Sequence, residues 1–275
     1  MSLTRAEESS APLQDSRYGT SEPTGRVTVV VAIVALVAAI VQAATGLGFA
    51  LVLGPALFAL LDPEDAIVGV TVLGLALNAL VLFGERRRPV VAWTEVRPLL
   101  VAAVPGALCG VLVLRALPKA WLQIAVGVAV VAAAALRARE HARAAEPSAG
   151  DPRARLALGF ATGTLTTSAG VNGPPIALWL TRRGLTPSEV RDSLSAAFMG
   201  LGLIGAVVLG PVLAAAGHDV EWRALGAGLV AVVAGHAAGH RAFARIDGER
   251  YEPLVLVLVV LAGVASVVAG AFALG

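Results

Sequence analysis

The most constraining feature of this chain is an uncharged run of 35 residues, from position 27 to position 61. A continuous helix of this length would measure about 52 Å, whereas the hydrocarbon core of a bilayer is about 30 Å thick. Two full crossings would need about 40 residues. The run is therefore too long for one membrane span and too short for two. We expect a hairpin of two helical arms, broken between Gly46 and Gly48, with Pro55 in the second arm.

Other apolar segments follow along the chain, of which 57% of residues are hydrophobic and 15% are charged. They cover residues 66–83, 98–117, 120–136, 156–181, 193–217, 224–240 and 253–274. Several reach or approach the length of about 20 residues that crosses a bilayer as a helix. These segments predict an all-α polytopic membrane protein. Residues 1–26 are polar and are expected to form a disordered tail, and the single cysteine, Cys109, excludes an intrachain disulfide.

A second interrupted segment covers residues 159–192, and its first two-thirds carry no charged side chain. Gly170, Asn172 and Gly173 permit backbone conformations that a helix does not use. Pro174 and Pro175 lack the N–H that an uninterrupted helix needs, but proline is well placed in the first turn of a new helix. We therefore expect two half-helices that meet at a loop, with the second half-helix beginning near Pro174.

A membrane limits where such a loop can lie, because irregular backbone persists there only if it is buried in protein or lines a polar cavity. A helix N-terminus offers N–H groups and a partial positive charge, which suit an anion. Six polar side chains precede the expected start of the second half-helix: Thr162, Thr164, Thr166, Thr167, Ser168 and Asn172. The alternative is a kinked helix in which the hydroxyls serve helix packing.

The two halves of the chain match one another in order. A shift of 124 residues aligns Gly46 with Gly170, Pro63 with Pro187, Asp65 with Glu189 and Thr71 with Ser195. A shift of 129 residues aligns Gly106 and Gly110 with Gly235 and Gly239, so that each half has a GxxxG motif in its third span. We infer a tandem duplication in which each half is a broken, re-entrant-like hairpin followed by three transmembrane helices. The first repeat covers residues 27–136, a linker 137–155, and the second repeat 156–275.

Arginine placement predicts the orientation of these repeats. The segments 84–97, 137–155, 182–191 and 241–250 each hold at least three arginines, whereas 62–65 and 217–221 are acidic or nearly neutral. By the positive-inside rule the first group is cytoplasmic and the second group is external. Three full crossings per half is an odd number, so the two repeats have inverted topology, as in many secondary transporters. Arg115 and Lys119 lie in a segment expected outside and depart from the rule.

The charge pattern also limits the chemistry. The net charge of +2 and the pI near 9.2 come from arginine clusters between apolar segments, which indicates loop topology rather than nucleic-acid binding. No Asp or Glu lies within the apolar segments, which argues against a proton relay of carboxylates and against a divalent-metal path. The remaining hypothesis is an anion held by helix N-termini, backbone N–H groups, hydroxyls and amides. Its candidate residues are Gln42, Thr45, Gly46, Gly48, Thr71, Thr166, Ser168, Gly170, Asn172, Gly173, Pro174, Pro175 and Ser195.

Two stretches resemble the sulfite exporter TauE/SafE family, also called the TSUP transporters. The first is GLGFALVLGP at residues 46–55. The second is a pattern made by Gly163, Ser168, Gly170, Gly173, Pro174, Pro175, Leu178, Leu180, Gly184, Pro187 and Arg191. The resemblance covers residues 27–274 and implies a cell-membrane exporter of small sulfur-containing or organic anions, such as sulfite, sulfonates or thiosulfate. It also adds Arg191 to the candidate site. Many members have three consecutive glycines where this chain has Gly46, Leu47 and Gly48.

Other functions stay open at this point. A proton-coupled symporter or importer would handle the same anions, with His236 or His240 as proton carriers or as a metal pair, although interfacial histidines beside Arg241 are the commoner case. An intramembrane hydrolase would pair Ser168 with His236 or His240. We expect a non-enzyme without cofactor or bound metal, whose partners are a small anion and membrane lipid and not nucleic acid. The oligomeric state is not predicted.

Overall fold

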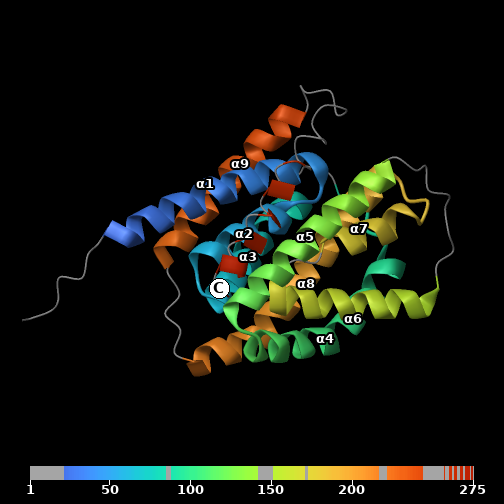
Figure 1. The fold of residues 1–275 in the computed structure, drawn as a ribbon. Coiled ribbons are helices and arrows are strands. Elements are labelled where there is room, and N and C mark those ends of the chain that lie inside the picture. Colours follow the sequence, from blue (N-terminus) through green and yellow to red (C-terminus); the bar gives the residue numbers. More distant parts are fainter. Residues whose placement is uncertain are drawn as a thin grey trace, which may run out of the picture.

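The structure is a computed structural model, and it describes residues 22–84, 88–141, 151–170, 173–216 and 222–243, with separate positions between 257 and 274. Every regular element in this part of the chain is an α-helix (Figure 1). In chain order they are α1 (Glu22–Thr45), α2 (Phe49–Leu60), α3 (Pro63–Phe83), α4 (Trp93–Ala116), α5 (Lys119–His141), α6 (Pro152–Ala169), α7 (Gly173–Thr181), α8 (Pro187–Ala216) and α9 (Trp222–Phe243). The predicted all-α fold is confirmed.

Both predicted helix breaks are present. Between α1 and α2 the chain passes through Gly46 and Gly48, with φ of 72° and 124°. Between α6 and α7 it passes through Gly170, with φ of 67°. Residues with a Cβ atom rarely adopt such angles, so these glycines permit the helices to end where they do. Gly46 and Gly170 are also the two glycines that the shift of 124 residues aligns.

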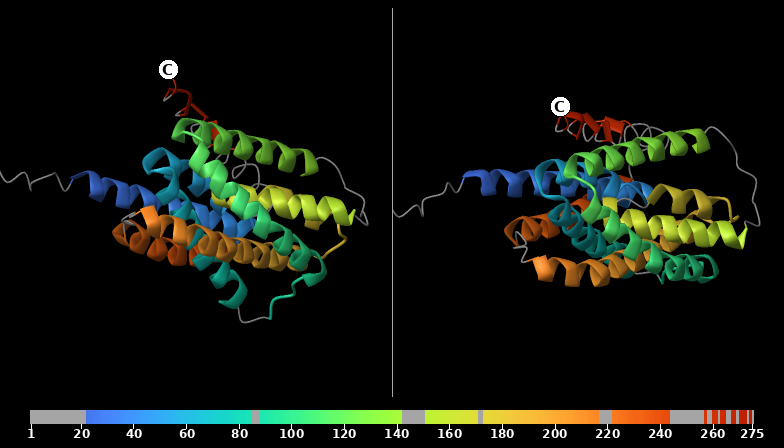
Figure 2. Two further views of the ribbon diagram at one scale, coloured as in Figure 1. Left: turned by 90° about the horizontal axis from the view of Figure 1, so that it is seen from below. Right: turned by 60° about the horizontal axis from the view of Figure 1, so that its bottom comes forward.

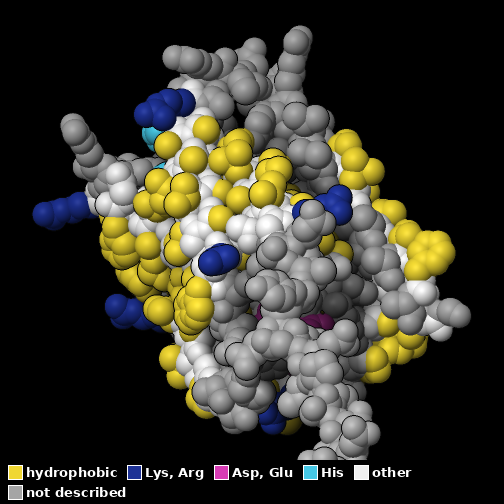
Figure 3. Space-filling view, turned by 90° about the vertical axis from the view of Figure 1, so that its left-hand side faces the viewer, with side chains coloured by type: hydrophobic (Ala, Val, Ile, Leu, Met, Phe, Trp, Pro, Cys, Tyr) yellow, Lys and Arg dark blue, Asp and Glu magenta, His cyan; other side chains and the backbone are white. Residues whose placement is uncertain are grey.

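Helix length separates spanning helices from half-helices. α1, α3, α4 and α8 contain stretches that are long and apolar enough to cross a bilayer. α2 and α7 have 12 and 9 residues, which correspond to only about 18 and 14 Å. Large apolar side chains on the spanning helices point outward, such as Val101 and Val207, which are 70% and 74% exposed. Figure 3 shows a face where hydrophobic side chains form a broad surface, with separate basic side chains among them. The chain is a multi-pass membrane protein.

The helices pack in pairs, and glycines allow the closest contacts. α4 lies along α6, α1 lies along α9, and α3 packs against α8 between these two pairs (Figure 1, Figure 2). A Cβ atom on Gly106 or Gly110 of α4 would overlap a backbone carbonyl of α6, and one on Gly235 would lie 2.6 Å from the Leu36 carbonyl oxygen of α1. Each of the two predicted GxxxG motifs therefore lies at a close helix contact, one where α4 meets α6 and the other where α9 meets α1.

Three of the four arginine-rich segments meet at one end of the molecule. The Glu95 carboxylate, in the first turn of α4, accepts hydrogen bonds from Arg183 at 3.1 Å, Arg155 at 3.4 Å and the Trp179 indole at 2.8 Å. Asp192 accepts a hydrogen bond from the Val90 N–H at 2.8 Å. Because Arg155 lies in the first turn of α6 and Arg183 follows α7, this hairpin begins and ends at the same end of the molecule.

Some boundaries differ from the sequence-based expectation. α1 begins at Glu22, so the last residues of the expected disordered tail, 22–26, are helical. α5 continues to His141, and α6 begins at Pro152 with Asp151 as its N-cap, whose carboxylate accepts the Arg153 N–H at 2.8 Å. The linker between these helices is therefore shorter than 137–155. The reason is that an apolar run marks the part of a helix that faces lipid, whereas its backbone hydrogen bonds continue into polar residues.

Candidate functional site

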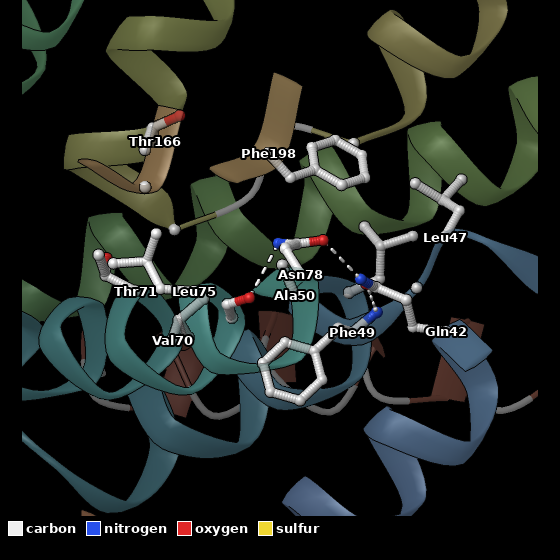
Figure 4. Close-up of a pocket in the computed structure, with 16 residues that line it drawn as sticks. Gln42, Leu47, Phe49, Ala50, Val70, Thr71, Leu75, Asn78, Thr166 and Phe198 are labelled. Carbon is white, nitrogen blue, oxygen red and sulfur yellow. Dashed lines mark hydrogen bonds between the residues drawn. The ribbon is translucent and has the colours of Figure 1, made fainter. Parts of the chain in front are cut away.

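A cavity lies where the two helix breaks meet (Figure 4). Its volume is about 50 Å³, several times the roughly 10–15 Å³ that one water molecule requires. It is lined by the end of α1, the start of α2, one face of α3, the end of α6, the start of α7 and one face of α8. The lining residues are Gln42, Leu47, Gly48, Phe49, Ala50, Leu51, Val70, Thr71, Gly74, Leu75, Asn78, Thr166, Gly170, Gly173, Phe198 and Gly202.

Two buried amides form the polar centre of the cavity wall. Gln42 and Asn78 are each 5% exposed. The Phe49 N–H donates to Gln42 Oε1 at 3.2 Å, and Gln42 Nε2 donates to Asn78 Oδ1 at 3.1 Å (Figure 4). Asn78 Nδ2 in turn donates to the Gly74 carbonyl oxygen at 2.8 Å. This chain of bonds ties the first helix break to α3 and compensates the cost of burying both amides.

Helix starts supply the other polar feature of the cavity. α2 begins at Phe49 and α7 begins at Gly173, and both residues line the cavity. The N-cap of α2 is Gly48, which has no side chain, and Gln42 accepts the first N–H of the helix in its place. Helix N-termini carry a partial positive charge, which favours an anion nearby. No charged side chain is among the described residues that line the cavity.

The match to a known family decides the identity of the chain. The family model described as Sulfite exporter TauE/SafE matches residues 31–266, which include both helix breaks and every residue that lines the cavity. The chain belongs to the TauE/SafE sulfite exporter family. No curated protein and no solved structure gives a significant match. Together with its apolar spanning helices, the family makes this chain a membrane transporter of the sulfite-exporter type with a small anionic substrate.

The cavity of this TauE/SafE protein brings together six of the residues that the sequence placed in a site. They are Gln42, Gly48, Thr71, Thr166, Gly170 and Gly173. They come from positions as far apart as 42 and 173, because the two helix breaks contact one another: a Cβ atom on Gly173 would overlap Cδ1 of Leu47. Their convergence on one cavity is the reason to propose that they bind the substrate.

Other predicted residues lie elsewhere. Ser168 donates its hydroxyl to the Thr164 carbonyl at 2.7 Å, and Ser195 is buried on α8, outside the cavity lining. Arg191 on α8 lies beside the first helix break, since a Cβ atom on Gly46 would be 3.5 Å from its Cγ. Pro174 and Pro175 lie in the first turn of α7, as expected, and Thr45 is the last residue of α1. Asn172 lies outside the described residues.

The hydroxyls of α6 serve mainly helix structure in this TauE/SafE protein. Thr164 and Thr167 donate across the helix interface to the Gly106 and Ala107 carbonyls of α4, at 3.0 and 2.8 Å. Thr162 donates to the Leu158 carbonyl of its own helix at 2.9 Å. Thr166 lines the cavity, but its hydroxyl donates to the Thr162 carbonyl at 2.7 Å. These contacts agree with the packing alternative for most of the six polar side chains.

Sequence reasoning missed Asn78 and the apolar part of the lining. Asn78 had a detectable signal, because it is an amide inside an apolar span and lies two helical turns after Thr71 on the same face of α3. The shift of 124 residues also relates members of the lining in pairs. These pairs are Gln42 with Thr166, Phe49 with Gly173, Gly74 with Phe198, and Asn78 with Gly202. The side chains of Leu47 and Leu75 carry no such signal, since an apolar side chain beside a cavity resembles any core residue.

Proposed function

We propose that this protein exports small sulfur-containing or organic anions, such as sulfite, sulfonates or thiosulfate, across the cell membrane. The observation that carries the proposal is the cavity between the two helix breaks, whose polar lining consists of uncharged donors and helix N-termini. Such groups stabilise an anion without neutralising it fully, so that it can be released again. Family membership supports the same substrate class.

We propose that the anion contacts Gln42, Thr71 and the start of α7 at Gly173, and that Arg191 attracts it from the cytoplasmic side. Arg191 and Phe198 are seven residues apart on α8, which places them on one face of the helix, two turns from one another. Phe198 lines the cavity, and Arg191 lies toward the end of the molecule where the arginine-rich segments meet. This geometry favours a path that begins at Arg191 and runs along α8 to the cavity.

The proposed mechanism is alternating access by two inverted repeats. In this arrangement α1 corresponds to α6 and α9 corresponds to α4. The contact between α1 and α9 then corresponds to the contact between α6 and α4, and both contacts are extensive. α3 likewise corresponds to α8, and these two helices pack against one another. The shared positive φ at Gly46 and Gly170 supports the same correspondence. A cavity on the boundary between the repeats would then open to either side as one repeat moves against the other.

A hydrolase is less well supported than a transporter. The Ser168 hydroxyl donates to a backbone carbonyl, whereas a nucleophile would donate to its base. His236 stacks on His240 along α9, with ring centroids 6.4 Å apart, and α9 packs along α1. The stacked pair leaves proton coupling as the main alternative mechanism for the same substrates.

The proposed function is tested by flux. Purified protein in liposomes should move at least one of sulfite, methanesulfonate, thiosulfate or acetate faster than protein-free liposomes do, with saturation at high substrate concentration. Correct insertion should be verified by protease protection of the same vesicles. The absence of flux for all four anions, with the protein correctly inserted, would overturn the proposal.

A further inference from the structure

The orientation of the Gln42–Asn78 amide pair follows from its two ends. A backbone N–H can only donate, so Gln42 must turn its oxygen to Phe49 and its nitrogen toward Asn78. A backbone carbonyl can only accept, so Asn78 must turn its nitrogen to Gly74 and its oxygen toward Gln42. The Phe49 N–H at one end of the pair and the Gly74 carbonyl at the other end therefore require the same positions for the oxygen and nitrogen atoms of both amides. The protein therefore fixes where each amide places its N–H groups.

These bonds leave capacity for a ligand. An amide nitrogen carries two hydrogens, and the bonds among the described residues use one hydrogen of Gln42 Nε2 and one of Asn78 Nδ2. The hydroxyl of Thr166, across the cavity, is already committed to the Thr162 carbonyl. Thr71 lies seven residues before Asn78 on α3, about 10 Å along the helix axis. Gln42 and Asn78, by contrast, are joined by a hydrogen bond of 3.1 Å, so the amide pair places two side-chain donors side by side in the cavity wall.

We propose that Asn78, together with Gln42, donates hydrogen bonds to the oxygens of the transported oxyanion and thereby determines its affinity. Asn78 is a binding residue in this proposal, which rests on the proposed transport function. The amide donors come from the first half of the chain only, because the shift of 124 residues aligns Gln42 with Thr166 and Asn78 with Gly202, and neither of these is an amide. The side-chain donors therefore belong to one repeat, and the other repeat contributes the start of α7 at Gly173 together with glycine and apolar surface.

A purely structural role for the pair makes a different prediction. If Asn78 only ties the first helix break to α3, its replacement should lower the thermal stability of the protein and leave the response to substrate unchanged. If Asn78 binds the anion, its replacement should remove the stabilisation that substrate confers, because a ligand stabilises only the state that binds it. The substrate-induced shift in unfolding temperature separates the two roles.

The test uses full-length protein, with sodium sulfite as the probe. Asn78→Leu removes the donors at similar volume, and Asn78→Asp keeps the oxygen that faces Gln42 but replaces the donor nitrogen with oxygen. Thr162→Val is the matched control, because it removes a buried hydrogen bond on α6 outside the cavity lining. Unfolding temperature is measured with and without sulfite, and half-saturating sulfite concentration is measured by flux from liposomes.

Sulfite should raise the unfolding temperature of the wild type and of Thr162→Val by the same amount. In both Asn78 variants this rise should vanish, and in either variant that folds the half-saturating concentration should increase about 5-fold to 150-fold. A wild-type rise and wild-type half-saturation in a folded Asn78 variant would overturn the proposal while leaving the transport function intact. Failure of the wild type to respond to sulfite or to move any anion would overturn both.

Discussion

Leu47 and Gly173 lie in contact across the two helix breaks, Leu47 between α1 and α2 and Gly173 at the start of α7. A Cβ atom on Gly173 would overlap Cδ1 of Leu47 and lie 3.4 Å from Cζ of Phe198. Three segments that are far apart in the sequence therefore enclose the same cavity. Leu47 can approach Gly173 this closely only because the glycine has no side chain.

Gly173→Val should abolish anion flux, because its side chain would displace Leu47 and fill the cavity. The atoms that it meets are ends of side chains, so the protein should still fold and insert. Gly226→Val on α9 is the matched control, since a Cβ atom there meets nothing within 4 Å. Flux in liposomes at equal protein content is the measurement. Wild-type flux in Gly173→Val would show that the cavity is not the substrate path.

Larger side chains at the contact between α4 and α6 should prevent these helices from packing. A Cβ atom on Gly106 would overlap the Phe160 carbonyl, which belongs to backbone and cannot move aside. We expect Gly106→Leu to prevent folding, whereas Gly210→Leu on α8 should be tolerated because open space surrounds that position. Size-exclusion profiles and unfolding temperatures in detergent would check this. A stable, monodisperse Gly106→Leu variant would contradict the close packing of these helices.

The ion-pair cluster at Glu95 should stabilise the second hairpin. The Glu95 side chain is 16% exposed and Arg183 is 10% exposed, so solvent screens this pair only partly. We expect Glu95→Gln to lower the unfolding free energy by about 1.5–3 kcal/mol, as for a hydrogen bond to a charged group. In a double-mutant cycle with Arg183→Gln, the two changes should be less than additive. Additive effects would mean that the two residues do not interact.

Orientation in the membrane is a separate prediction from arginine placement. Pro89 lies among the arginine-rich segments and Asp62 lies between α2 and α3, and both are exposed. In a Cys109→Ala background, Pro89→Cys should resist an impermeant maleimide in intact cells, whereas Asp62→Cys should react with it. Labelling of both positions after permeabilisation is the control. The reverse pattern in intact cells would invert the orientation.

Sequence patterns sufficed for the helix breaks because glycine and proline act locally. Gly46, Gly48 and Gly170 were expected to interrupt helices, and each adopts a positive φ. Pro174 was expected near the start of a helix, and α7 begins one residue before it. Each of these expectations depends on the backbone of one or two residues and requires no knowledge of neighbouring helices.

The cavity lining was only partly predictable because it depends on which helices become neighbours. The spacing of Thr164 and Thr167 places them on one face of α6, but spacing does not reveal that this face meets α4 carbonyls. Phe198 was not expected at the site, since the apolar pattern of α8 is the same for core and cavity positions. Asn78 could have been predicted, because an amide inside an apolar span needs a hydrogen-bond partner.

The potential dependence of sulfite efflux from liposomes tests the central claim most directly. No described residue in the cavity lining is acidic, so the anion should move with its own charge, and a negative interior drives it outward by about 2.3 kcal/mol per charge per 100 mV. For a monovalent anion, a potential of about 100 mV could sustain a concentration ratio of roughly fortyfold across the membrane. With the potential set by potassium and valinomycin at equal pH on both sides, efflux should rise as the interior becomes negative. The account would be contradicted by efflux that does not change with the potential but follows a pH gradient, and that no longer responds to pH in His236→Gln.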